Sequence, residues 1–138
     1  MFENPEGVQC AEDLTRAISS LDRDVFASIY TDDAQIWHNS TNAIQTKAEN
    51  VELLASIFAI VDSLHYADIR RLPTPEGFVQ RHVVRGTFKD GTPVPDLHAC
   101  IVARVADGKI SQLNEYIDPA QFQMVWDRLG DGGLAANP

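Results

Sequence analysis

The 138-residue chain has the length of one domain, and its 11 basic and 20 acidic side chains give a formal net charge of −9. This negative charge disfavours nucleic acid and anionic membranes as partners. No apolar stretch approaches the roughly 20 residues that span a bilayer. Residues 1–10 lack the pattern of a secretory signal, and two cysteines do not make a disulfide framework. We therefore expect a cytoplasmic protein.

Helical periodicity dominates the first third of the chain. Apolar residues recur at three- and four-residue steps over residues 8–21, which predicts a first helix. Asp22 or Asp24 can cap a short second helix that follows it. Residues 34–39 then read as a short strand.

A third helix is predicted to begin at Thr46, because Glu49 stands three residues later, as in a capping box. After it the apolar period changes from helical to two, with turn signals between the apolar runs. Asp118-Pro119 opens a last helical segment that continues through Trp126. The predicted strands are 63–72, 78–88, 97–105 and 110–117.

Three helices followed by a run of antiparallel strands indicate an α+β architecture. We expect a single domain over residues 1–138, with its core at about 8–127 and a flexible tail at 128–138.

Two segments resemble a known superfamily. Residues 21–38, LDRDVFASIYTDDAQIWH, resemble the helix–turn–strand opening of SnoaL-like and ketosteroid-isomerase-like proteins. Residues 106–118, from ADGKI through EYID, resemble the closing strand of the same nuclear-transport-factor-2-like (NTF2-like) superfamily. The resemblance implies a cone-shaped, curved, mostly antiparallel sheet that wraps around N-terminal helices and encloses an apolar pocket. It implies little about function, because the superfamily includes isomerases, dehydratases, epoxide hydrolases, cyclases and non-catalytic binding domains.

The resemblance also implies site residues. An ungapped alignment places His38 where ketosteroid isomerases carry the aspartate base and where limonene epoxide hydrolases carry an asparagine that holds water. It places Glu115 where those hydrolases carry a water-activating aspartate. By strand alternation and alignment, the pocket wall is expected to include Leu14, Tyr30, Ile36, Phe58, Leu97, Ala99, Ile101, Leu113 and Ile117.

The chain departs from both enzyme patterns. The isomerase's tyrosine falls at Leu14 and its buried acid near Ile101, so neither half of that oxyanion hole is matched. The hydrolase's Arg-x-Asp pair falls near Arg81 and Val83, which keeps the arginine and loses the acid. Neither mechanism transfers as a whole.

The residues themselves suggest acid–base chemistry. A histidine titrates near neutrality, and a carboxylate beside it can fix its tautomer, so His38 and Glu115 can transfer a proton in an apolar pocket. Arg81 can polarise an oxygen. His82 joins the site if its strand face points inward; alternation favours that face, whereas counting back from the Asp90-Gly91 turn favours the other.

Three interpretations stay open. The first is a cofactor-free isomerase, dehydratase or epoxide-hydrolase-type enzyme that acts on a small, apolar, cyclic molecule. The second is a non-catalytic binding domain with the same pocket, and the third is an interaction module. We also expect a homodimer through the outer sheet face around Asp96, His98, Cys100 and Val102. The four histidines lack close ligand spacing, so we expect no metal, and the pattern predicts no cofactor.

Overall fold

A computed structural model of the protein describes residues 3–130. The helices of this part are α1 (Pro5–Ser20), α2 (Arg23–Ala27), α3 (Lys47–Phe58) and α4 (Pro119–Leu129). Its strands are β1 (Tyr30–His38), β2 (Ala43–Thr46), β3 (Val61–Pro73), β4 (Gly77–Phe88), β5 (Pro93–Ala106) and β6 (Lys109–Ile117).

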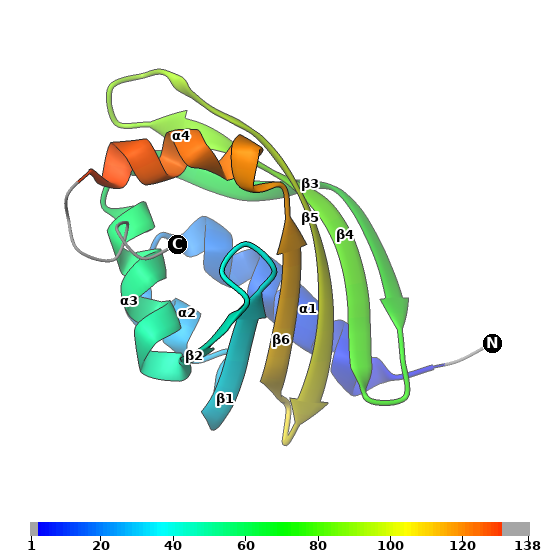
Figure 1. The fold of residues 1–138 in the computed structure, drawn as a ribbon. Helices are drawn as coiled ribbons and strands as arrows, with labels where there is room; N and C mark the ends of the chain where they lie inside the picture. The colour runs from blue at the N-terminus through cyan, green and yellow to red at the C-terminus, as the bar shows by residue number, and fades with distance from the viewer. Residues whose placement is uncertain (1–2, 131–138) are drawn as a thin grey trace.

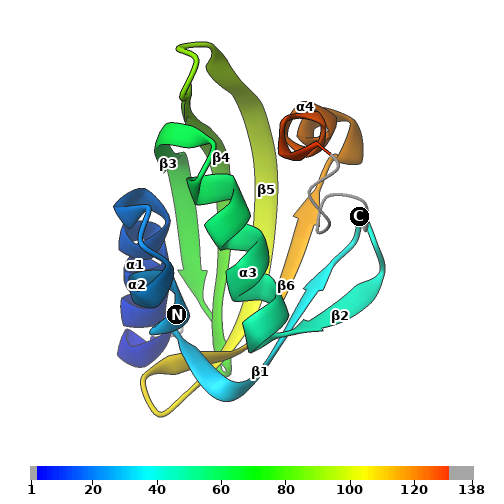
Figure 2. The ribbon, with the colours of Figure 1, turned by 90° about the vertical axis from the view of Figure 1, so that its left-hand side faces the viewer.

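The strands form a six-stranded sheet in the order β2-β1-β6-β5-β4-β3. β1 and β6 are parallel, and every other neighbouring pair in this sheet is antiparallel. The sheet is curved, and α1, α2 and α3 lie on its inner side, while α4 lies across one end (Figures 1 and 2). The predicted α+β class with a mostly antiparallel, curved sheet around N-terminal helices is confirmed.

Caps explain where the helices begin. α1 starts before the predicted residue 8, because Asn4 accepts a hydrogen bond from the Gly7 amide and Pro5 occupies the first helical position. Asp22 caps α2. Thr46 and Glu49 form the predicted capping box at the start of α3, with both reciprocal hydrogen bonds present.

Several elements differ in their bounds from the sequence-based prediction; β5, for example, begins at Pro93 rather than at residue 97. β1 begins at Tyr30 rather than at residue 34, and β2 was not predicted. β2 has four residues, most of them exposed, so it carries no apolar alternation from which a strand can be recognised. α4 extends to Leu129, into the segment predicted as a tail, and residues 131–138 of that tail lie outside the described residues.

The core lies between the inner helices and the concave face of the sheet. Its large, fully buried side chains come from α1 and from all the central strands: Leu14, Tyr30, Ile36, Phe78, Phe88, Ile101 and Ile110. None of the helices described between residues 3 and 130 is long and apolar enough to cross a bilayer.

Candidate functional site

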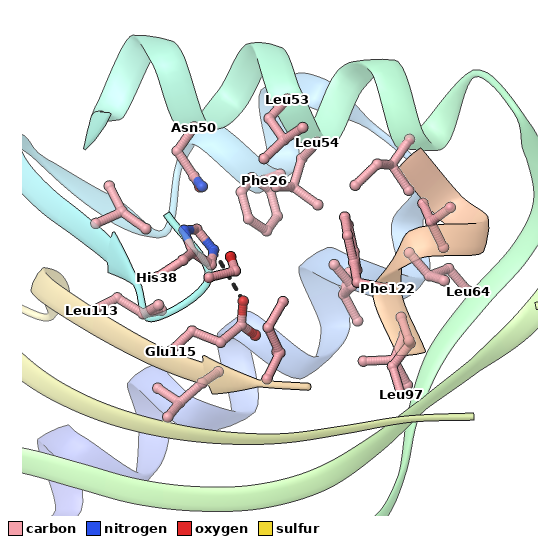
Figure 3. A pocket seen from close by; sticks show the side chains of 18 of the residues that line it. Phe26, His38, Asn50, Leu53, Leu54, Leu64, Leu97, Leu113, Glu115 and Phe122 are labelled. Carbon is pink, nitrogen blue, oxygen red and sulfur yellow. Dashed lines mark ion pairs between the residues drawn. The ribbon is translucent and has the colours of Figure 1, made fainter. Parts of the chain in front are cut away.

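A cavity of about 120 Å³ lies inside the cone. Its wall is mostly apolar, with side chains from α1, α3, α4 and the inner face of the sheet (Figure 3). The polar residues on this wall are Tyr30, His38, Ser40, Thr41, Gln45, Asn50, Tyr66 and Glu115. A concave apolar site with a few convergent polar groups is the usual form of a small-molecule site.

His38 and Glu115 meet in this cavity because their strands are parallel neighbours. β1 and β6 pair in a register that places His38 beside Glu115, although the two residues are far apart in the chain. Paired residues of neighbouring strands project from the same face of a sheet. His38 Nε2 lies 3.0 Å from Glu115 Oε1, and the two side chains are only 15% and 18% exposed. Figure 3 shows them pointing toward one another below Asn50.

The environment of Glu115 keeps its carboxyl group ionised. Burial raises the pKa of this carboxyl, but the hydrogen bond from His38 and the charges that His38 and His82 carry when protonated outweigh burial and leave the pKa below its usual range. An ionised carboxylate can only accept hydrogen bonds, so His38 donates through Nε2–H. The second ring nitrogen, Nδ1, is then the atom with which His38 can engage a bound molecule.

Asn39 holds the ends of these two strands together. Its side-chain amide donates to the Ile117 carbonyl oxygen at 3.0 Å, and its Oδ1 accepts from the Ile117 amide at 2.9 Å. The Asn39 backbone amide also donates to the Glu115 carbonyl oxygen at 3.1 Å. The register that brings His38 to Glu115 is therefore fixed by the residue that follows His38.

A second polar group lies on the α3 side of the cavity. Tyr30 donates its hydroxyl hydrogen to Asn50 Oδ1 at 3.0 Å, and Asn50 Nδ2 donates to Gln45 Oε1 at 3.0 Å. Burial raises the pKa of the Tyr30 hydroxyl far above its ordinary value, and the charge of Glu115 adds to this effect. Asn50 and Gln45 were not predicted. Helical spacing was a usable signal, because Asn50 shares a face of α3 with Leu53, Leu54 and Ile57.

The structure places most of the expected wall residues on the cavity: Leu14, Tyr30, Ile36, Leu97, Ile101, Leu113 and Ile117. Two expected wall residues are buried elsewhere. Phe58 packs edge-to-face on Phe26 with ring centroids 6.0 Å apart, and Phe26 is the ring of this pair that lines the cavity. Ala99 is 5% exposed and does not line the cavity.

β4 directs His82 inward and Arg81 outward. Gln80 and His82 are buried on the inner side, whereas Arg81 is exposed and lies opposite Cys100 of β5 on the other face. Arg81 is thus not on the cavity wall, where an oxygen-polarising residue would have to be. The alternating apolar pattern identified the inward face correctly, and the count from the Asp90-Gly91 turn did not, because the β4–β5 register shifts between Val84 and Gly86.

Tyr66 of β3 is a wall residue that sequence analysis missed. Its ring stacks on His82 with centroids 3.6 Å apart. Among residues 3–130, no three His, Cys, Asp or Glu side chains gather closely enough to hold a metal ion.

The sequence matches the SnoaL-like domain family over residues 11–113, which is most of the chain. The chain belongs to the SnoaL-like domain family. The NTF2-like resemblance read from residues 21–38 and 106–118 is thereby confirmed. A comparison with curated proteins gives no match.

Solved structures share the SnoaL-like fold at low sequence identity. PrhC from Penicillium brasilianum has a TM-score of 0.76 at 14% identity, with 96% of this chain and 93% of that chain covered. An epoxide hydrolase of the LEH-like type from M. tuberculosis has a TM-score of 0.70 at 18% identity, with 89% and 90% covered. A protein with a ketosteroid isomerase-like fold from Catenulispora acidiphila, solved with trimethylamine, has a TM-score of 0.68 at 15% identity, with 83% and 86% covered. At these identities the likeness shows the fold alone.

Proposed function

We propose that this SnoaL-like protein is an acid–base enzyme that acts, without a cofactor, on a small, largely apolar, cyclic molecule bound in the cavity. The observation that carries the proposal is the His38–Glu115 hydrogen bond at 3.0 Å on an otherwise apolar wall. A buried pair of titratable groups in a concave site is the usual arrangement for proton transfer.

The two residues take different roles in this proposal. Glu115 holds the Nε2–H tautomer of His38 and stabilises the imidazolium that forms when His38 accepts a proton. His38 Nδ1 removes a proton from the substrate or from a water, and later returns it. Isomerisation, dehydration and epoxide opening all need such a step, and similar structures include an epoxide hydrolase and a ketosteroid isomerase-like fold.

A ligand screen followed by an activity assay tests the proposal. We expect a member of a panel of steroids, terpenoid epoxides and polyketide-like phenols to raise the melting temperature, since a ligand at 100 times its Kd adds about 2.7 kcal/mol to the free energy of unfolding. With a substrate from that class, we expect His38→Gln to lower kcat by about 10²–10⁴-fold.

Two variants complete the design. Glu115→Gln should change the ligand-induced shift, whereas Glu12→Gln, on the exposed side of α1, should not. Full turnover by His38→Gln would contradict the enzymatic role. Binding that is unaffected by Glu115→Gln, without turnover of any ligand, would instead support the alternative of a non-catalytic binding domain.

We also propose that two copies associate through the outer face of the sheet. The registers align a row across all six strands on this face: Ile44, Trp37, Asn114, Val102, Val79 and Leu72. Ile44, Val102 and Leu72 are 62%, 42% and 68% exposed. All residues of this row except Asn114 are apolar, and exposed apolar side chains gathered on one face favour a protein interface. The predicted cytoplasmic location stays a prediction, which the localisation of a tagged protein would check.

A further inference from the structure

A chain of polar side chains runs through the core behind the cavity wall. Arg71 of β3 donates to Thr15 Oγ1 of α1 at 3.2 Å through Nη2 and to Gln80 Oε1 at 2.9 Å through Nε. Gln80 Nε2 then lies 3.0 Å from His82 Nδ1. Gln80 and His82 are 0% and 1% exposed, and the proposed reaction of His38 and Glu115 uses neither of them.

The direction of every hydrogen bond in this chain is determined by Arg71. A guanidinium group has only donors, so the Gln80 side chain must present its oxygen to Arg71 and its amide hydrogens to His82. Thr15 meets the same requirement, because its hydroxyl donates to the Ala11 carbonyl oxygen at 2.9 Å and its oxygen accepts from Arg71. His82 Nδ1 is therefore an acceptor, and the ring proton lies on Nε2.

His82 Nε2 has no hydrogen-bond partner. It is the one buried side-chain nitrogen or oxygen of residues 3–130 without a partner. Burial and, to a smaller extent, the charge of Arg71 lower the pKa of His82 to about 4 against the opposing effect of Glu115, so the ring is neutral at pH 7. A buried N–H that bonds to nothing is costly, and in native proteins it calls for an explanation.

The position of His82 offers an explanation for its unpaired N–H group. Register places His82 beside Ala99 of β5, and Ala99 beside Ile117 of β6. Side chains on both sides of His82 line the cavity, among them Val84, Ile101 and Ile117. His82 itself does not line the cavity, but it lies next to residues that do. Tyr66, itself on the cavity wall, covers it by stacking at 3.6 Å with an interplanar angle of 15°.

We propose that Arg71 and Gln80 are positioning residues that hold His82 as the neutral Nε2–H tautomer, and that this N–H binds an oxygen atom of the cavity ligand once the Tyr66 ring shifts aside. The second half rests on the proposed function. The ligand class then narrows to apolar ring compounds that carry an acceptor oxygen, such as a carbonyl, a phenol or an epoxide. Hydrocarbons without oxygen leave the N–H unsatisfied.

The first half is tested on the free protein. Long-range proton–nitrogen NMR of 15N-histidine-labelled protein at pH 7 distinguishes the two tautomers, and His82→Phe identifies the His82 signals. We expect a protonated Nε2 and an unprotonated Nδ1. Gln80→Met should convert this into a mixture of tautomers, whereas Gln9→Met, on an exposed position of α1, should leave it unchanged. A protonated Nδ1 in the wild type, or an unaltered tautomer in Gln80→Met, would overturn the assignment.

The second half is tested with two probes of similar shape, 2-naphthol and 2-methylnaphthalene. Kd is measured from the methyl shifts of cavity residues in the wild type and in His82→Phe, which keeps a ring for stacking on Tyr66. One hydrogen bond should make the preference for 2-naphthol about 2–10-fold greater in the wild type than in the variant. Gln80→Met, which keeps His82, should likewise lower the preference for 2-naphthol relative to the wild type.

An equal preference in the wild type and both variants would overturn the role of His82 in binding. If neither probe shifted any cavity signal, this ligand class would be overturned, whereas the proposed function is decided separately by the ligand panel and by the turnover of His38→Gln. The tautomer measurement would still decide the first half separately.

Discussion

Glu115 remains ionised in a largely apolar cavity because His38 lies within hydrogen-bond distance. Removing the imidazole would leave the Glu115 carboxylate, whose side chain is 18% exposed, without its partner. The free-energy cost of such an unpaired charge exceeds the net stabilisation that the pair provides. A polar substitution at His38 is therefore a better probe of chemistry than alanine is.

His82 makes stability depend on pH in a defined window. Arg71, Tyr66 and Glu115 are the titratable groups around it. The unfolded chain protonates this histidine below about pH 6.5, whereas the folded protein does so only at about pH 4. The free energy of unfolding should therefore fall by about 3 kcal/mol as the pH decreases from 6.5 to 4 and be unaffected by His82 above that window.

Urea unfolding at a series of pH values checks this prediction. His82→Phe should lose the decrease between pH 6.5 and 4, while His65→Gln, at an exposed position, should retain it. Glu115 acts in a lower window: its lowered pKa means that its contribution is lost as the pH falls below about 4.5. Parallel curves for the wild type and His82→Phe would show that His82 is not held neutral.

At the scale of elements, α1 approaches the β3–β4 turn closely enough to exclude a side chain. A Cβ atom at Gly7 would lie 2.2 Å from the Gly77 carbonyl oxygen, and Asn4 Nδ2 donates to the Thr74 carbonyl oxygen at 2.9 Å in the same region. The contact anchors the first turn of α1 to the far end of the sheet. It thereby positions Leu14 on the cavity wall.

Gly7→Ala should destabilise the protein although alanine favours helices. The clash involves backbone atoms that cannot rotate away, so we expect a net loss of about 1–3 kcal/mol, after a gain of about 1 kcal/mol in helix propensity. Gln9→Ala in the same helix is exposed and should change the free energy of unfolding by less than about 0.5 kcal/mol. Chemical denaturation measures both, and a more stable Gly7→Ala would contradict the close contact.

At the scale of the whole molecule, the two faces of the sheet differ in what covers them. The inner face is covered by helices and encloses the cavity, while the outer face carries the apolar row from Ile44 to Leu72. Trp37 and Tyr116 also meet there edge-to-face, with centroids 5.2 Å apart. A second copy would remove this surface from water.

Val102→Glu should shift the protein from dimer to monomer at micromolar concentration. Val25 offers a matched control, because both valines are 42% exposed, and Val25 belongs to α2 rather than to the sheet. A buried, unpaired carboxylate opposes association at the first site and has no effect at the second. Sedimentation velocity gives the mass of each variant, and a monomeric wild type would refute the proposed dimer.

The family and every element except β2 could be predicted before the fold was known. Local signals were sufficient for this: Thr46 and Glu49 cap α3 wherever the helix packs, and apolar alternation marks β3 to β6. It also singled out His38 and Glu115, through resemblance to a family that the chain is shown to belong to.

The contacts of these residues, by contrast, follow from long-range packing. The parallel β1–β6 register that joins His38 to Glu115, and the inward face of β4 that buries His82, depend on pairing between distant strands. A slip of one residue would reverse each face without changing any local propensity. The hydrogen-bonded chain from Thr15 through Arg71 to His82 likewise joins three elements that are not neighbours in sequence spacing.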